Sequence, residues 1–183
     1  MTHAVRARHA APESDYADVI APQTVRLQRR LPGPIERAWA WVADSDLRRQ
    51  WLAAGDMSGG EGSTFELVWR NDELTDPPGS KPEGFGEEHR MRSIVTTWDP
   101  PHRLAFTWGD TGSVEIELER AGDGVLLTLV HRGISDHRNL LMIGAGWHMH
   151  LDVLVARASG TAPAPFWDGW RRLHGEYADR IPA

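Results

Sequence analysis

One long apolar helix, predicted over residues 138–159, constrains this fold more than any other feature of the sequence. Its apolar and small residues recur every three or four positions, so they share one face. They are Leu140, Ile143, Gly144, Trp147, Leu151, Leu154, Val155 and Ala158. The opposite face is not strongly polar, which predicts burial on two sides. The stretch also carries charged and imidazole side chains, which favours the central helix of a soluble domain over a membrane span.

Both ends of this helix carry the signals expected of helix termini. Ser135 or Asp136 can accept a backbone N–H of the first turn. Gly160 can adopt the left-handed stop, and Pro163 prevents continuation. Residues 144–146, Gly-Ala-Gly, lie inside the helix and do not follow a strand, so they are not a dinucleotide-binding turn. We expect these glycines to let the sheet approach the helix closely.

Before this helix, apolar and polar residues alternate in short stretches, which is typical of half-buried strands. The predicted strands cover residues 24–31, 65–70, about 88–98, 104–108, 114–119 and 127–132. Turn residues at 99–101 and 122–124 join neighbouring strands tightly, so an antiparallel sheet is expected. Between the first two strands, residues 34–42 and 47–51 have the spacing of two short helices.

The order of these elements predicts the α+β class. We expect a curved antiparallel sheet of six strands around the long C-terminal helix, with two short helices after the first strand. Residues 1–22 lack periodicity and are interpreted as a flexible N-terminal arm. Residues 23–160 are predicted to form the domain, and residues 161–183 a short helical tail packed on it.

Composition excludes several classes of site. The formal charge of −6 argues against a nucleic-acid surface, and the absence of cysteine excludes disulfides and thiolate metal ligands. The N-terminus has no apolar segment of the kind found in secretory signals, so a cytoplasmic location is expected. The nine tryptophans outnumber the two tyrosines and four phenylalanines. Such rings either fill a core or line a cavity.

Six residues are the candidates for lining a cavity between sheet and helix, because their positions in the predicted strands and helix allow them to face inward. They are Trp69, Phe106, Trp108, His131, Trp147 and Leu151. For the tryptophans, packing in the core is the alternative interpretation. His131 shares the parity of Leu127 and Leu129, so it is either a core histidine with a hydrogen-bond partner or a ligand-anchoring or acid/base group.

Other polar residues are interpreted as structural. Histidines 148 and 150 point in nearly opposite directions on a helix, so they cannot share a metal ion by themselves. His148 and Asp152 are four residues apart and can, but a zinc site would need a third ligand. We therefore predict no metal and no cofactor. The pairs Asp56 with Glu61 and Glu87 with Glu88 are interpreted as solvated loop charges.

Four segments carry a resemblance to a known family: LPGPIERAWAWVADSDLRRQWLA, PPHRLAFTWG, LTLVHRGI and AGWHMHLDVL. They resemble the family named for activators of the heat-shock protein 90 ATPase, within the SRPBCC superfamily (START-like, birch-pollen-allergen-like). The similarity covers roughly residues 24–160. It implies a helix-grip fold with a hydrophobic cavity between the sheet and the long helix. The superfamily includes lipid and hormone binders, cyclases, hydrolases and co-chaperones, so the fold does not define the function.

Three hypotheses of function follow. The first is a domain that binds a hydrophobic or amphipathic small molecule in the cavity, without nucleic acid or membrane span; a homodimer is compatible with it. The second is an enzyme of the cyclase or hydrolase type that uses the same cavity, with His131 or His148 as acid/base. The third is a protein-interaction module with a chaperone or regulatory partner, which would show a filled interior and an exposed apolar patch.

Overall fold

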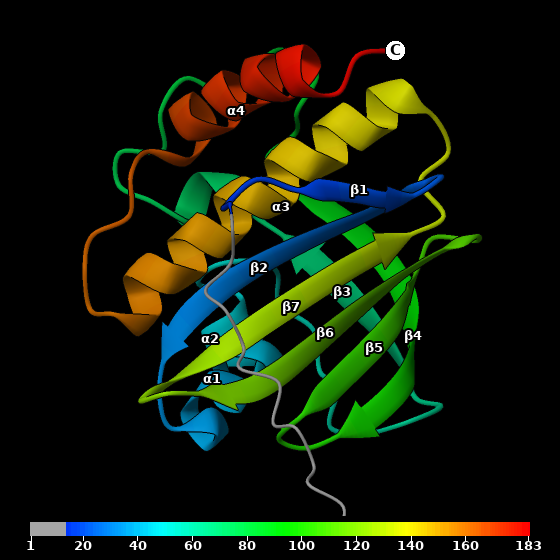
Figure 1. Ribbon diagram of the computed structural model, residues 1–183, viewed down its shortest axis with the longest axis vertical. Helices are drawn as coiled ribbons and strands as arrows, with labels where there is room; N and C mark the ends of the chain where they lie inside the picture. Colours follow the sequence, from blue (N-terminus) through cyan, green and yellow to red (C-terminus); the bar gives the residue numbers. More distant parts are fainter. Residues whose placement is uncertain (1–13) are drawn as a thin grey trace, which may run out of the picture.

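The predicted long helix is α3, His137–Ala158. In the computed structural model, which describes residues 14–183, α3 packs against one face of a curved antiparallel sheet (Figure 1). Its N-cap is Asp136, whose Oδ1 accepts the backbone N–H of Asn139 at 2.9 Å. Gly160 follows its C-terminus with a φ of 71°. The capping and stop signals in the sequence are therefore confirmed.

The sheet has seven strands in the order β1-β2-β7-β6-β5-β4-β3, and each pairs antiparallel with its neighbours. The strands are β1 Asp18–Ala21, β2 Thr24–Pro32, β3 Thr64–Trp69, β4 His89–Asp99, β5 Arg103–Trp108, β6 Gly112–Ala121 and β7 Gly124–Arg132. The predicted hairpin joins β6 to β7, where Ala121 pairs with Gly124 and Gly122 has a φ of 65°. Alternation along the strands turns one row of apolar residues toward α3.

The seventh strand, β1, corrects the prediction of six strands. Residues 18–21 belong to the predicted arm 1–22, whereas in the structure they pair with β2 through Val19 opposite Val25. All four side chains of β1 are exposed, so this strand has no buried face that could produce an alternating pattern. Residues 1–13 of the predicted arm lie outside the described part of the chain.

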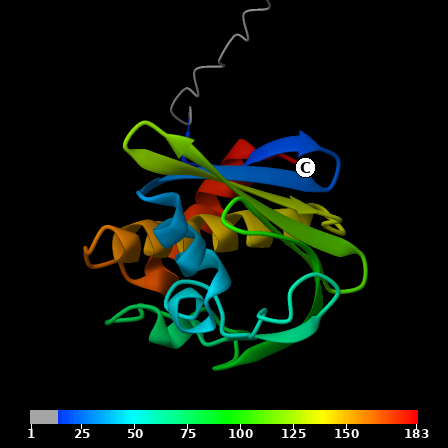
Figure 2. The same cartoon turned by 90° about the horizontal axis from the view of Figure 1, so that it is seen from below.

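Two short helices follow β2, as predicted, and lie nearest to the viewer in Figure 2. They are α1, Ile35–Ala43, and α2, Ser45–Arg48. The buried guanidinium of Arg48 donates to the carbonyl oxygens of Val42, Ala43 and Gly55, which ties both helices to the chain that follows them. A 3-10 turn, η1 (Asn71–Glu73), opens the long loop between β3 and β4.

Helix α4, Phe166–Arg180, covers the side of α3 that faces away from the sheet (Figure 1). A Cβ atom on Gly144 of α3 would lie 3.6 Å from the ring of Tyr177 of α4. Gly144 therefore faces α4, whereas we expected it to face the sheet, and at this ordinary contact distance the approach of α4 does not require a glycine. The burial of α3 on two sides is explained by the sheet and α4 together. None of the helices in residues 14–183 has both the length and the apolarity that crossing a bilayer requires.

Candidate functional site

A pocket of about 410 Å³ lies between α3, α4, the long loop and the ends of β3, β4 and β5. Pockets of this size suit small organic ligands. Its aromatic lining comes from every one of these elements except β4, which contributes a histidine. The lining rings are Trp69, Phe85, Trp108, Trp147, Phe166, Trp167 and Trp170. Five of the nine tryptophans of the chain therefore meet at one place.

The tryptophans contact one another and still leave this space open. The ring of Trp108 lies 5.4 Å from the ring of Trp69 and 5.4 Å from that of Trp147, measured between centroids. Phe85, from the long loop, lies 5.0 Å from Trp167 and 5.1 Å from Trp170. These are tilted and edge-to-face pairs, the arrangement that aromatic quadrupoles favour. The walls are thus built from rings that support each other.

His131 lies outside the pocket and contacts two of the residues that line it. The indole N–H of Trp147 donates to Nδ1 of His131 at 2.9 Å, so the neutral imidazole carries its proton on Nε2. Burial lowers the pKa of His131 to about 4, which keeps it neutral at pH 7. Its ring also contacts Trp108, at 4.9 Å. His131 therefore orients two wall residues without lining the pocket itself.

The six predicted residues divide into two groups. Trp69, Trp108 and Trp147 line the pocket. Phe106 instead packs on Phe65 in the core at 5.8 Å, and Leu151 is fully buried. Together with His131, these residues lie where the interior is filled. Alternation and helical period indicate which side chains face inward, but they do not indicate where along an element the filled core ends and the pocket begins.

Several lining residues were not singled out by sequence analysis. They come from the long loop and from α4, whose partner surfaces are formed only in the fold. The backbone N–H of Trp167 donates to Pro78 O at 2.8 Å, and its indole N–H donates to Asp72 Oδ1 at 2.6 Å. These bonds join the loop to α4. The sequence does contain one indication of this wall. Three aromatic rings at positions 166, 167 and 170 of a short predicted helix need an apolar surface to pack against.

Glu88, at the pocket rim, is exposed like Glu87, as expected for a solvated loop charge, and it also pairs with two arginines. Its carboxylate accepts from Arg90 Nε at 2.6 Å and from Arg70 Nε at 2.8 Å. These hydrogen bonds lower the pKa of Glu88. Two guanidinium groups therefore compensate its charge, and the rim does not present a free carboxylate.

His150 is the buried polar residue of the pocket lining. Its Nδ1 lies 2.7 Å from the carbonyl oxygen of Trp51. A carbonyl oxygen only accepts, so Nδ1 carries the proton and Nε2 has the free lone pair. Burial lowers the pKa of His150 to about 4. Its ring lies 4.9 Å from Phe166, another lining residue.

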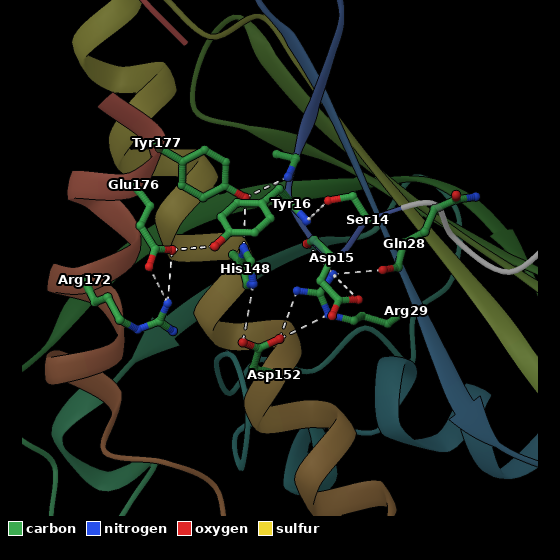
Figure 3. A network of polar contacts seen from close by, with 11 residues as sticks. Ser14, Asp15, Tyr16, Gln28, Arg29, His148, Asp152, Arg172, Glu176 and Tyr177 are labelled. Carbon is green, nitrogen blue, oxygen red and sulfur yellow. Dashed lines mark hydrogen bonds and ion pairs between the residues drawn. The ribbon is translucent and has the colours of Figure 1, made fainter. Parts of the chain in front are cut away.

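His148 belongs to a polar network on another side of α3 (Figure 3). The Tyr177 hydroxyl accepts the N–H of Ala17 at 2.7 Å and donates to Nδ1 of His148 at 3.0 Å. His148 Nε2 lies 3.5 Å from Asp152 Oδ2. Arg29 donates to Asp152 Oδ1 from Nη2 at 2.9 Å and from Nε at 3.2 Å. None of these residues lines the pocket.

The same network holds the first described residues against α4 (Figure 3). The Tyr16 hydroxyl donates to Glu176 Oε2 at 2.6 Å, and Glu176 also accepts from Arg172 Nη1 at 2.8 Å. Burial lowers the pKa of His148 to about 3 and raises that of Tyr177 to about 12. Both groups are thus neutral at pH 7, and their arrangement joins three segments of the chain. Within residues 14–183, no group of three or more His, Asp or Glu side chains is placed to hold a metal ion.

Comparisons with known proteins place the chain in one family. The family model described as "Activator of Hsp90 ATPase homolog 1-like protein" matches residues 32–159. A protein from Bordetella parapertussis, solved by solution NMR, is 36% identical, with a TM-score of 0.75 and coverage of 94% of this chain and 95% of that one. No curated protein matches the sequence.

Two more distant structures share the fold. CalU16 from Micromonospora echinospora is 21% identical, with a TM-score of 0.64 and coverage of 87% of this chain and 89% of that one. An AHSA1-like protein from Aeromonas hydrophila is 16% identical, with a TM-score of 0.57 and coverage of 75% and 94% respectively. At such identities the likeness describes the architecture, and the site must be argued from its own residues.

Proposed function

Because the chain belongs to the family of Activator of Hsp90 ATPase homolog 1-like proteins, we propose that it binds an apolar or amphipathic small molecule between the sheet and α3. The observation that carries this proposal is the pocket of about 410 Å³, into which five tryptophans converge. Apolar surface that side chains leave uncovered gains free energy when a ligand removes it from water. Concave, mostly apolar sites with a few polar groups are typical of small-molecule binding.

The geometry gives less support to the enzyme hypothesis. That hypothesis relies on His131 or His148 as acid/base, and neither lines the pocket. His131 accepts from Trp147, and His148 contacts both Tyr177 and Asp152. A general base must reach the proton that it removes. Their positions favour structural roles.

The interaction-module hypothesis requires a filled interior and an apolar surface patch. The interior contains the pocket, and the exposed large apolar side chains within residues 14–183 are Val19 and Ile20 on β1 and Ile94 on β4. The first two lie on the edge strand β1, and β4 lies on the other side of the sheet, next to the opposite edge strand β3. This distribution supports ligand binding over a broad docking face. The homodimer and the cytoplasmic location stay predictions.

A pocket-blocking variant tests the proposal. Gly146 of α3 lines the pocket, and a Cβ atom there would meet only Trp170 Nε1, at 4.0 Å. Gly146→Phe should therefore place a ring in the pocket. Gly175→Phe is the matched control, because Gly175 lies on α4 and a Cβ atom there meets nothing within 4 Å.

The measurement is quenching of tryptophan fluorescence by naphthalene, with the thermal midpoint recorded for each variant. We expect the wild type and Gly175→Phe to bind alike, and Gly146→Phe to bind at least about tenfold more weakly. Naphthalene should also raise the midpoint of the wild type. Equal binding by all three proteins, or no binding by any, would overturn the proposal. Native mass spectrometry of the purified wild type would show a natural guest.

A further inference from the structure

The polar groups of the pocket differ in their access to a ligand. Glu88 and His89 are exposed at the rim, where Glu88 binds two arginines and His89 packs on Trp69 at 5.4 Å. His150 lies deep, with only 7% of its surface exposed. Asn71 also lines the pocket, and its buried Oδ1 has no hydrogen-bond partner within residues 14–183. The interior polar groups are therefore His150 and Asn71.

The hydrogen bond of His150 to the protein decides what it offers to a ligand. Trp51 O accepts the proton on Nδ1 at 2.7 Å, which leaves Nε2 as an acceptor. Nε2 makes no hydrogen bond to any other residue of the described chain. The rings of Phe166 at 4.9 Å and Trp147 at 6.5 Å flank this imidazole and supply no such donor toward it. A hydrogen-bond donor to Nε2 would therefore come from outside residues 14–183, and the pocket that His150 lines gives a molecule access to it.

The charges of the pocket lining further limit the class of ligand that fits. No lysine or arginine is among the described residues that line the pocket, and the rim carboxylate already has two guanidinium partners. An anionic group would thus lose its hydration without meeting a lysine or arginine, which is costly. Fatty-acid carboxylates and phosphates fit this lining poorly. Flat rings fit it well, because tilted and edge-to-face contacts with indoles are favourable.

We propose that the pocket selects uncharged, flat aromatic molecules that carry a hydroxyl or N–H donor, and that Nε2 of His150 accepts this hydrogen bond. The proposal rests on the binding function above and specifies its ligand class. His150 acts as a specificity-determining residue. A ligand that donates a hydrogen bond to this acceptor in the apolar wall binds more tightly, whereas a ligand without a donor leaves the acceptor unpaired.

Four molecules that share one bicyclic ring test this selectivity. Naphthalene has no polar group, 2-naphthol has a donor and is uncharged at pH 7, 2-methoxynaphthalene keeps the oxygen without the donor, and 2-naphthoate is an anion. Titrations followed by tryptophan fluorescence should give 2-naphthol an affinity about tenfold above that of 2-methoxynaphthalene. The affinity of 2-naphthoate should be the weakest of the four.

The variant His150→Asn assigns the preference to Nε2. Its side-chain amide can still donate to Trp51 O from the place of Nδ1, while nothing replaces Nε2. We expect the preference of the pocket for 2-naphthol over 2-methoxynaphthalene to be lost in this variant. If this variant fails to fold, the comparison of 2-naphthol with 2-methoxynaphthalene on the wild type still tests the selectivity for a hydrogen-bond donor.

The outcomes separate the two proposals. If naphthalene binds but 2-naphthol binds no better than 2-methoxynaphthalene, the donor selectivity is wrong and the binding function stands. If 2-naphthoate binds most tightly, the argument from charge is overturned. If none of the four molecules binds, the proposed function fails and the selectivity with it.

Discussion

His148 and His150 lie two residues apart on α3, yet they belong to different regions of the molecule. Both ring nitrogens of His148 face protein partners, Tyr177 and Asp152. His150 lines the pocket, bonds Trp51 through one nitrogen and has no partner within residues 14–183 for the other. Both are buried, and burial lowers the pKa of each. Burial and a perturbed pKa therefore do not distinguish a structural histidine from a ligand-facing one; the nitrogen left without a partner does.

We expect the residues of the pocket wall to contribute much of the free energy of unfolding, and Trp147→Ala tests this expectation. Trp147 is 3% exposed, contacts Trp108 and donates to His131. Its removal should lower the free energy of unfolding by about 3–5 kcal/mol, since it leaves a cavity and an unpaired imidazole. Urea denaturation of both proteins measures the difference. Trp147→Phe should lose less, and a loss below about 1 kcal/mol for Trp147→Ala would mean that this wall is not part of the core.

In the polar network around His148, Asp152→Ala should lower the free energy of unfolding and leave ligand binding unchanged. The change removes the carboxylate that accepts hydrogen bonds from Arg29, whose side chain is 4% exposed, and leaves Asp15 Oδ1 at 4.0 Å as its remaining carboxylate partner. We expect a loss of about 2–3 kcal/mol in urea denaturation, because a buried guanidinium that loses a charged hydrogen-bond acceptor loses more free energy than the pair contributed. Asp152→Asn keeps an acceptor and should lose less. Naphthalene affinity should stay at the wild-type value; a large change would show that the two regions are not separate.

The pH dependence of stability tests the buried histidines together. The pKa is lowered to about 4 in His131 and His150 and to about 3 in His148, whereas an unfolded histidine titrates near 6.5. Between these values the unfolded chain binds more protons, so stability is complete above about pH 6.5 and falls as the pH decreases toward 4. Urea denaturation across this range should show a shallower fall for His150→Asn, by about one proton. Parallel curves for the two proteins would contradict a neutral, buried His150.

The smallest effect is expected for Tyr177→Phe. The change keeps the ring beside Gly144 and removes the hydroxyl that Ala17 and His148 share. A loss of about 1–2 kcal/mol is expected, since one donor and one acceptor lose their partner. Amide hydrogen exchange should be faster at Ala17 than in the wild type, while the strands exchange as before. Unchanged exchange at Ala17 would mean that this hydroxyl does not hold the N-terminal segment.

The accuracy of the sequence-based predictions depended on how local each signal was. The cap at Asp136, the stop at Gly160 and the hairpin at residues 122–124 were predictable because they involve residues a few positions apart. The strand β1 was not, because its exposed side chains carry no pattern. The role of Gly144 was also misjudged, since helical period locates a face and does not identify the element that covers it.

The sequence by itself determined the α+β class, the central helix and the inward side of the strands whose apolar residues alternate, because backbone geometry imposes periods of 3.6 and 2 on residues that share a face. Only the tertiary structure decided where the interior stays open. The pocket requires Phe85 of the long loop, Trp170 of α4 and Trp69 of β3 to meet. It also decided that Trp51 O takes Nδ1 of His150 and thereby leaves Nε2 free. Such contacts join residues about a hundred positions apart, and no local pattern records them.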